Sequence, residues 1–174
     1  DKFQQLYSTV NPVASSHFNF SAPEPTGVVS IIAPQNNSLI GLVSVIAPII
    51  AGGNTCVVLA SASKPLCAVT FAEVLGTSDV PGGTINILTG KPGELLSWFS
   101  DHMDVNAIVF CENDKEAILK IQQKATLNLK RVLLWNNYNW LLETAQNPYL
   151  INDAQEIKTT WHPIENIGGA KAGY

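Results

Sequence analysis

The distribution of apolar residues predicts alternating strands and helices along most of the chain. Residues 28–32 (VVSII) form an unalternating, mostly β-branched run, which is typical of a strand buried on both faces of a parallel sheet. The almost wholly apolar residues 38–51 predict a helix, Gly52-Gly53 predicts its end, and residues 54–59 predict a second buried strand. Together they predict one right-handed βαβ unit.

The same alternation continues to residue 135. The remaining strands are expected at residues 84–88, 104–111 and 130–135, and the remaining helices at residues 66–75, 92–99 and 113–124. Five strands that alternate with helices predict an α/β fold with a doubly wound, Rossmann-like parallel sheet of five strands. Beyond residue 136 the pattern fades, and residues 146–153 resemble a loop.

Both ends of the chain carry the period-two alternation of half-buried strands, at residues 16–21 and 156–163. We expect these segments to pair as an accessory β-flap at the edge of the main sheet, with an apolar surface for a protein partner. The side chains expected at that interface are Phe18, Phe20, Ile157, Thr159 and Trp161.

These patterns divide the chain into four parts. Residues 1–25 form an accessory strand segment, residues 26–145 a Rossmann-like domain, residues 146–164 a return to the flap, and residues 165–174 a tail. Because the chain starts at Asp1 and not at Met, we expect it to be a piece of a longer protein.

Composition supports a well-buried globular protein, with 46% hydrophobic and 14% charged residues. The net charge of -4 leaves no basic patch and argues against nucleic acid and anionic membranes as partners. The longest apolar run, residues 39–51, is too short to span a bilayer, and no signal peptide opens the chain. We expect a cytoplasmic protein.

The cysteines and histidines do not form a recognisable site. Cys56, Cys67 and Cys111 lie in apolar stretches without CxxC spacing, which is typical of buried thiols in a reducing compartment. The three histidines are scattered without metal-ligand spacing, so no metal site is expected. They are His17, His102 and His162.

Five segments between residues 25 and 134 carry a family pattern. They read GVVSIIAPQNNSLIG, APIIAGGNTCVVLAS, DVPGGTINILTG, VNAIVFC and NLKRVLL. Their order and spacing resemble the nucleotide-binding domain of aldehyde dehydrogenases. That family binds NAD(P) on this sheet and oxidises aldehydes through a cysteine thiohemiacetal. The resemblance therefore implies positions for that chemistry.

The resemblance places the oxyanion-binding residue after the first strand and the ribose-binding residues after the second. The family's oxyanion Asn, in a Pro-Trp-Asn run, matches Asn36, whose amide could donate to a developing oxyanion. Alternatively Asn36 only caps the following helix, with Asn37 and Ser38 as competitors, and without a nucleophile nearby we favour the cap. The ribose-binding Lys and Glu match Ala60 and Ser63, which cannot replace them.

After the fourth strand, the family opens a helix with a Gly-Ser pair that approaches the pyrophosphate of the cofactor. Here Glu112 and Asn113 match that pair, and Glu112 and Asp114 place negative charge where the phosphates would lie. Asn113 and Glu116 also have the spacing of a capping box, which would satisfy the helix end internally. We therefore expect no bound cofactor.

The catalytic positions are also changed. Trp135 matches the general base Glu, and an indole cannot accept a proton at neutral pH. Tyr138 and Trp140 either line an aromatic surface with Trp135 or pack in the core, which we favour. None of the cysteines matches the nucleophile. The family's catalytic domain is missing before residues 156–164 (EIKTTWHPI), which resemble the family's oligomerisation strand.

These departures favour a non-catalytic, pseudoenzyme domain that acts in structure, oligomerisation or protein interaction, similar to the second domain of family-16 aldehyde dehydrogenases. Its expected partner is a catalytic domain of its parent protein or a second subunit, in a homodimer through the flap. One alternative is a fragment that supplies the NAD(P)-binding part of an active dehydrogenase. Another is that Ser61, Ser63, Asn36 and Asn37 line a crevice for a different small ligand.

Overall fold

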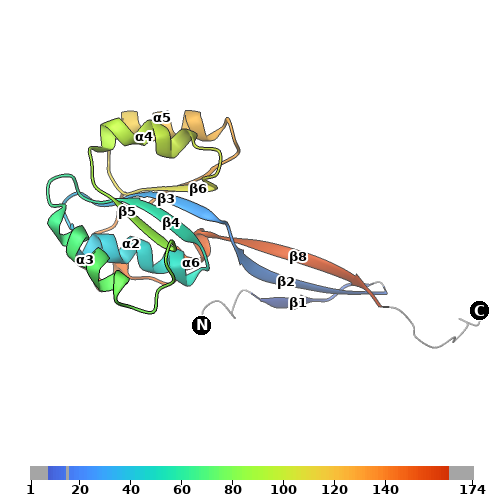
Figure 1. Ribbon diagram of the computed structural model, residues 1–174. Helices are drawn as coiled ribbons and strands as arrows, with labels where there is room; N and C mark the ends of the chain where they lie inside the picture. Colours follow the sequence, from blue (N-terminus) through green and yellow to red (C-terminus); the bar gives the residue numbers. More distant parts are fainter. Residues whose placement is uncertain (1–7, 15, 165–174) are drawn as a thin grey trace, which may run out of the picture.

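The computed structural model describes residues 8–14 and 16–164 and contains two sheets (Figure 1). The parallel sheet has the order β5-β4-β3-β6-β7, as the sequence predicts for a doubly wound fold. Its strands are β3 (Val28–Ile32), β4 (Thr55–Leu59), β5 (Ile85–Leu88), β6 (Ala107–Phe110) and β7 (Arg131–Leu134). The predicted tail at 165–174 and the first seven residues of the predicted segment 1–25 lie outside the described residues.

The second sheet, which we call the ribbon, is antiparallel and has the order β1-β2-β8. Its strands are β1 (Thr9–Asn11), β2 (His17–Pro25) and β8 (Gln155–Pro163). Figure 1 shows the ribbon extending away from the parallel sheet and its helices. The pairing of β2 with β8 confirms the predicted flap, and β1 adds a third strand that the sequence pattern did not predict.

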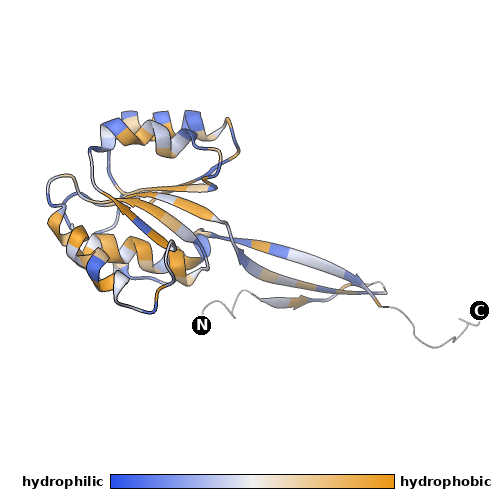
Figure 2. Ribbon diagram, viewed as in Figure 1, coloured by the Kyte–Doolittle hydropathy of each residue, from blue (hydrophilic) through white to orange (hydrophobic). Residues whose placement is uncertain are grey.

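Helices cover both faces of the parallel sheet. They are α2 (Ile40–Ala51), α3 (Leu66–Gly76), α4 (Pro92–Asp101), α5 (Lys115–Ala125) and α6 (Tyr149–Asp153), with a short 3-10 turn at Glu143–Ala145. Figure 1 shows α2, α3 and α6 on one side of the sheet and α4 and α5 on the other. Figure 2 shows the strands of this sheet mostly in the hydrophobic colour, which fits burial under two helix layers.

β3 is the central strand, and its side chains divide between two cores. Val29 and Ile31 pack into the core beneath α2, and Ile32 packs into the core beneath α4 and α5. The helix that follows β3 ends where the sequence predicts, because Gly52 caps it and Gly53 has a φ of 84°, in the left-handed region that glycine tolerates best.

Residues 135–154 join β7 to β8 and pack across the α2 side of the sheet. Trp135 and Trp140 are only 3% and 2% exposed and belong to the α2-side core, which confirms core packing for both. Residues 149–153 form α6, so the expectation of a loop there is wrong. Its five residues are too few to show helical periodicity, and the helix is held by burial of Leu150.

A buried polar junction attaches the ribbon to the parallel sheet. The Asn54 side chain donates to the carbonyl oxygen of Ala154 at 2.8 Å and accepts from the Gly27 backbone N–H at 2.9 Å. Gln155 Nε2 donates to the Gly52 carbonyl oxygen at 3.2 Å. Because both amide side chains are buried and bonded, they hold the start of β8 beside the end of α2.

Candidate functional site

The carboxyl ends of β3, β4 and β6 meet at one edge of the sheet, which we call the carboxyl edge. In open α/β sheets ligands bind at this edge, where the strand order reverses. Here Gln35 occupies it. The backbone N–H of Gln35 donates to Glu112 Oε1 at 2.7 Å, and Gln35 Oε1 accepts from the Ala62 N–H at 2.8 Å. Gln35 therefore bridges the loops after all three strands.

Two further hydrogen bonds hold Gln35 in this position. Its Nε2 donates to the Ala33 carbonyl oxygen at 3.0 Å, and its own carbonyl oxygen accepts from Ser61 Oγ at 2.8 Å. Ser61 is 2% exposed and also lies 3.3 Å from the hydroxyl of Ser63. Ser61 and Ser63, two of the residues named for the alternative of a ligand crevice, thus already have hydrogen-bond partners within the chain.

The sequence analysis did not single out Gln35, which joins these three loops. A signal for it is present, because Gln35 replaces the Trp of the family's Pro-Trp-Asn run. The neighbouring Asn36, which the resemblance matches to the family's oxyanion Asn, is exposed. The expectation that Asn36 caps the next helix is wrong: α2 begins at Ile40 after Leu39, and no side chain caps it.

The N-terminus of α5 is capped by Asp114. Its Oδ1 accepts from the backbone N–H groups of Glu116 at 3.0 Å and Ala117 at 3.1 Å. The predicted capping box of Asn113 and Glu116 is therefore wrong by one residue, because α5 starts at Lys115. The prediction that this helix end is satisfied within the chain is confirmed, because the Asp114 carboxylate bonds two of its free amides.

The remaining positions of the predicted site are spread along the carboxyl edge. The Asn113 side chain donates to the Asn136 carbonyl oxygen at 2.9 Å and so joins the loops after β6 and β7. Ala60 is fully buried. Trp135, which the resemblance matches to the general base, is buried, and its Nε1 donates to Asp153 Oδ2 at 3.2 Å. An indole N–H bonded in this way is a donor only and cannot accept a proton.

The buried cysteine thiols are poor nucleophiles. Burial raises the pKa of Cys56 to about 12, and burial raises the pKa of Cys111 even further. Because the thiolate is the reactive form, both side chains are unreactive at neutral pH. Cys67 is only partly buried, and its Sγ lies 3.5 Å from Ser38 Oγ. No described group of His, Cys, Asp and Glu side chains could hold a metal ion.

The predicted interface residues occupy both faces of the ribbon. The register pairs Phe18 with His162 and Asn19 with Trp161, so Phe18 and Trp161 point to opposite sides. Phe18 and Phe20 share one face, where the Phe20 ring stacks on His162 at 5.9 Å. Ile157, Thr159 and Trp161 share the other. The expectation of a single apolar surface is wrong, and the interface role of these five residues stays a prediction.

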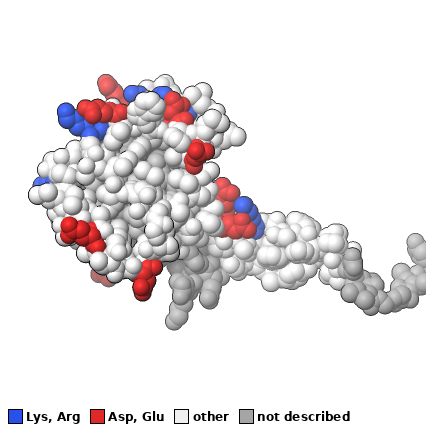
Figure 3. Space-filling model, viewed as in Figure 1, with Lys and Arg blue, Asp and Glu red and all other residues white. Residues whose placement is uncertain are grey.

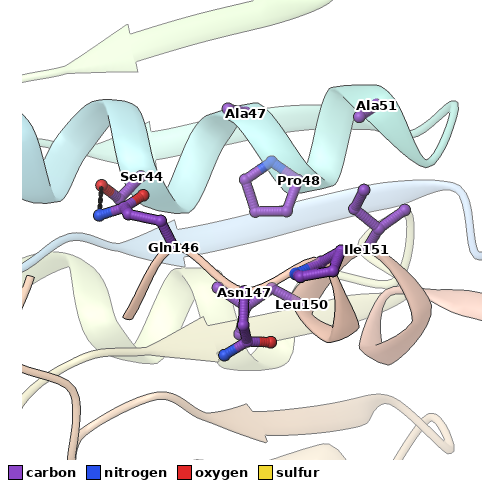
Figure 4. A pocket seen from close by; sticks show the side chains of 9 residues that line it. Ser44, Ala47, Pro48, Ala51, Gln146, Asn147, Leu150 and Ile151 are labelled. Atoms are coloured by element: carbon purple, nitrogen blue, oxygen red, sulfur yellow. Dashed lines mark hydrogen bonds between the residues drawn. The ribbon is translucent and has the colours of Figure 1, made fainter. Parts of the chain in front are cut away.

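A cavity of about 300 Å³ lies between α2 and residues 146–151, away from the carboxyl edge (Figure 4). Its walls are mainly apolar and include Ala47, Pro48 and Ile151. The polar contact at its end joins Gln146 Nε2 to Ser44 Oγ at 2.8 Å. No ionisable side chain lines it, so the cavity offers packing space without acid–base chemistry.

Over the described residues, no helix has the length and apolar character needed to cross a membrane. Charged side chains of both signs are mixed over the surface of α4 and α5 and at the base of the ribbon (Figure 3). One such pair joins Lys124 and Asp101 at 2.7 Å, where the lysine holds the pKa of Asp101 below its usual range. This surface does not present the single-sign patch that favours a polyanion.

Known proteins share the sequence of this chain over most of its length. The sequence profile of the aldehyde dehydrogenase family matches residues 1–137. The 2-hydroxymuconic semialdehyde dehydrogenase of Pseudomonas sp. (strain CF600) is 32% identical over 123 residues, which cover 69% of this chain and 25% of that protein. An aldehyde dehydrogenase of Enchytraeus buchholzi is 36% identical over 123 residues, which cover 71% of this chain and 25% of that protein.

Solved structures share the fold. The crystal structure of PnpE from Pseudomonas sp. WBC-3 matches with a TM-score of 0.71 at 28% identity, over 76% of this chain and 27% of that chain. A structure of PnpE in complex with nicotinamide adenine dinucleotide matches with a TM-score of 0.69 at 28% identity, over 76% and 28%. The chain spans about a quarter of the length of the curated relatives it matches.

Proposed function

The chain belongs to the aldehyde dehydrogenase family, and from this premise we propose that it is a non-catalytic member of the fold that acts in structure and assembly. In this proposal the parallel sheet is a stable body that carries the ribbon. The ribbon contacts a protein partner, which is a second subunit or another part of a longer parent protein. The chain binds no NAD(P) and transfers no hydride.

The hydrogen-bonded closure of the carboxyl edge is the observation that carries this proposal. A dinucleotide needs free amides and open space where Gln35 and Glu112 bond each other. Removing Gln35 from this position would break its bonds to Ala62 and Ser61 as well. The Glu112 carboxylate would also repel a pyrophosphate, because both groups are negative. Cofactor binding would therefore break internal hydrogen bonds of the chain and would be opposed by charge repulsion.

The chemistry of the surrounding residues supports the same function. Trp135 replaces a base with a hydrogen-bond donor, and the thiols of Cys56 and Cys111 stay protonated at neutral pH. Only residues 135–154 separate β7 from β8. This segment is already packed against the sheet, so it adds no second domain between the two strands.

A second candidate is that the chain supplies the nucleotide-binding part of an NAD(P)-dependent aldehyde dehydrogenase. The comparisons favour it, because its relatives carry dehydrogenase names and the matching PnpE structure contains the dinucleotide. The exposed Asn36 at the oxyanion position is consistent with it. On this hypothesis the loops that carry Gln35 and Glu112 separate when the cofactor arrives.

Isothermal titration calorimetry of the purified chain with NAD and NADP distinguishes the two candidates. We expect no heat of binding up to millimolar cofactor, and PnpE titrated in parallel serves as the positive control. Saturable binding at micromolar cofactor contradicts the non-catalytic proposal and supports the second candidate. A variant that combines Gln35→Trp, Glu112→Gly and Asn113→Ser tests whether the closure is what excludes the cofactor: we expect measurable affinity only after these changes.

A further inference from the structure

The α4 side of the parallel sheet is only partly covered. The chain passes from the edge strand β5 through α4 to β6, and α4 packs on β3 and against α5. The residues of β4 show the consequence: Cys56 and Val58, on the α2 side, are 0% exposed, whereas Val57, on the α4 side, is only partly buried. Inner strands of a doubly wound sheet are usually buried on both faces, so the open face beside α4 departs from the usual packing.

A cavity of about 380 Å³ lies on this open face. Ser30 of β3 pairs with Val57 of β4, and Leu88 of β5 pairs with the residue two positions beyond Val57. These three side chains therefore share one face of the sheet and form the floor of the cavity. α4 and the segment after it supply further lining residues, which are Leu95, Trp98, Phe99, His102, Asp104 and Val105.

The size and the walls of the cavity favour a small, flat, apolar ligand. Its volume lies near the lower end of the range for small-molecule pockets, about 300–1,000 Å³. Two of the side chains on the α4 wall, Trp98 and Phe99, are aromatic, and Trp98 is 71% exposed. A ring that covers this indole removes apolar area from water, and aromatic rings also attract one another through their edges and faces.

Ser30 places one buried polar group in the floor. It is 1% exposed, and its Oγ lies 3.5 Å from the carbonyl oxygens of Phe99 and Ala107. Bonds between two oxygen atoms are usually about 2.5–3.0 Å long, so both contacts are weak. The hydroxyl proton can serve only one of them, and over the described part of the chain no N–H or O–H donates to this Oγ. A ligand N–H or O–H that reaches Ser30 would satisfy a buried acceptor.

The charge around the cavity disfavours an anion. Its described lining residues include one carboxylate, Asp104, and neither lysine nor arginine. His102 lies beside this carboxylate, and its Nδ1 accepts from the Asp104 N–H at 3.3 Å. Lys130 donates to the carbonyl oxygens of His102 and Val105 at 2.7 and 2.9 Å and is not among the lining residues. A negatively charged ligand would therefore meet a carboxylate without a cation in the lining to bind it.

We propose that this cavity is a binding site for a small aromatic molecule that has no negative charge and carries an N–H or O–H group. The rings lie on the floor formed by β3, β4 and β5 and against Trp98 of α4, and the donor bonds the Oγ of Ser30. This site goes beyond the function proposed above and does not depend on it, because Gln35 and Glu112, which close the carboxyl edge, do not line the cavity.

Fluorescence titration with N-phenyl-1-naphthylamine tests the site. This probe has two aromatic ring systems, one N–H group and no charge, and its emission rises in an apolar environment. We expect saturable binding with a dissociation constant below about 200 µM, the value that the ligand efficiency of drug-sized molecules gives for a probe of this size. Absence of saturable binding to the chain overturns the proposal.

Two variants locate the bound probe. Val57→Phe fills the floor of the cavity and should weaken binding at least about tenfold. The matched control is Val74→Phe, which adds the same side chain to a second apolar cavity, of about 550 Å³, between α2 and α3. This control should change the affinity by less than about twofold. Loss of binding in Val74→Phe but not in Val57→Phe assigns the probe to the second cavity and overturns the proposal.

A pair of probes tests the hydrogen bond to Ser30. In 1-benzylnaphthalene a CH₂ group replaces the N–H of the first probe, and its affinity is measured by displacement of that probe. Ser30→Ala should weaken N-phenyl-1-naphthylamine about three- to tenfold and 1-benzylnaphthalene by less than about twofold. Equal weakening of the two probes contradicts the bond to Ser30 and overturns the proposed ligand class.

A third probe tests the charge preference. 8-Anilinonaphthalene-1-sulfonate has the rings and the N–H of the first probe and adds a sulfonate, so it should bind at least about fivefold more weakly than N-phenyl-1-naphthylamine. Asp104→Asn should narrow this difference, because it removes the carboxylate without changing the shape of the side chain. Sulfonate binding as tight as that of the neutral probe contradicts the exclusion of anions.

Circular dichroism checks the folding of each variant. If Val57→Phe does not fold, the Ser30→Ala comparison decides, because that variant removes a single buried oxygen atom and the two probes are compared in the same protein. A general loss of structure in Ser30→Ala would weaken both probes, whereas loss of the hydrogen bond weakens only the probe that carries the N–H.

Discussion

The backbone N–H of Gln35 lies 2.7 Å from Oε1 of Glu112, and this hydrogen bond joins the loop after β3 to the loop after β6. The two residues are far apart in sequence but meet at the edge where a doubly wound sheet binds ligands. The bond uses a backbone amide and a carboxylate that would otherwise be open to solvent or ligand. This hydrogen bond therefore stabilises the carboxyl edge and at the same time closes it to a ligand.

Glu112→Ala should lower the free energy of unfolding by about 1.5–3 kcal/mol, since it removes a hydrogen bond between a half-buried carboxylate and a backbone amide. Urea unfolding followed by circular dichroism measures the change. Glu73→Ala, at an exposed position of α3, is the matched control and should change stability by less than about 0.5 kcal/mol. Equal effects of the two substitutions would show that the bond to Gln35 contributes nothing.

Asp114→Ala should destabilise the chain by about 1 kcal/mol, because the first amides of α5 lose their acceptor. Asp114→Asn should retain most of that stability, because asparagine also caps helices well. Asn113→Ala serves as the comparison, since its side chain makes one exposed hydrogen bond outside the helix. Urea unfolding measures the loss of stability in each variant. A larger loss from Asn113→Ala than from Asp114→Ala would show that Asn113, and not Asp114, caps α5.

Trp135→Glu places the family's base residue in this chain. The side chain is 3% exposed in an apolar core, so an unpaired carboxylate there should cost several kcal/mol. We expect strong destabilisation and no aldehyde-dependent NADH formation. Trp135→Phe is the control that keeps an aromatic ring and loses the bond to Asp153, and it should cost about 1–2 kcal/mol. Gain of dehydrogenase activity in Trp135→Glu would contradict the proposed function.

Thiol labelling with a disulfide reagent at pH 8 should modify Cys67 rapidly in the native chain and leave Cys56 and Cys111 unmodified until unfolding. Cys67→Ser should abolish the fast phase. The reason is the raised pKa of both buried thiols. Rapid modification of more than one thiol would contradict the burial of these side chains.

The same shifts predict how stability depends on alkaline pH. A thiol whose pKa is higher in the folded chain than in the unfolded chain contributes stability below the unfolded pKa, near 9.0 for Cys56, and loses it as the pH rises toward about 12. Cys56→Ala should therefore flatten the decline of stability above pH 9.0. If urea unfolding shows the same decline of the free energy of unfolding above pH 9.0 in Cys56→Ala as in the unmodified chain, the raised pKa of Cys56 is contradicted.

The strands and helices were predictable from sequence because their signals are local. The β-branched run of β3, the apolar residues of α2 and the Gly52-Gly53 stop depend only on neighbours along the chain. The period-two alternation at residues 16–21 and 156–163 similarly identified the two strands, β2 and β8, that pair in the ribbon. α6 and β1 escaped prediction because they are short and are held by packing and pairing with distant segments.

The sequence by itself determined the α/β architecture, the ribbon strands β2 and β8, and the departures from the family pattern at positions such as Ala60 and Trp135. Only the tertiary structure decided that Gln35 closes the carboxyl edge, that Asp114 and not Asn113 caps α5, and that Phe18 and Trp161 face opposite ways. These facts depend on which distant loops meet and on the register of paired strands. A shift of one residue in register moves every side chain to the other face, and no local pattern records it.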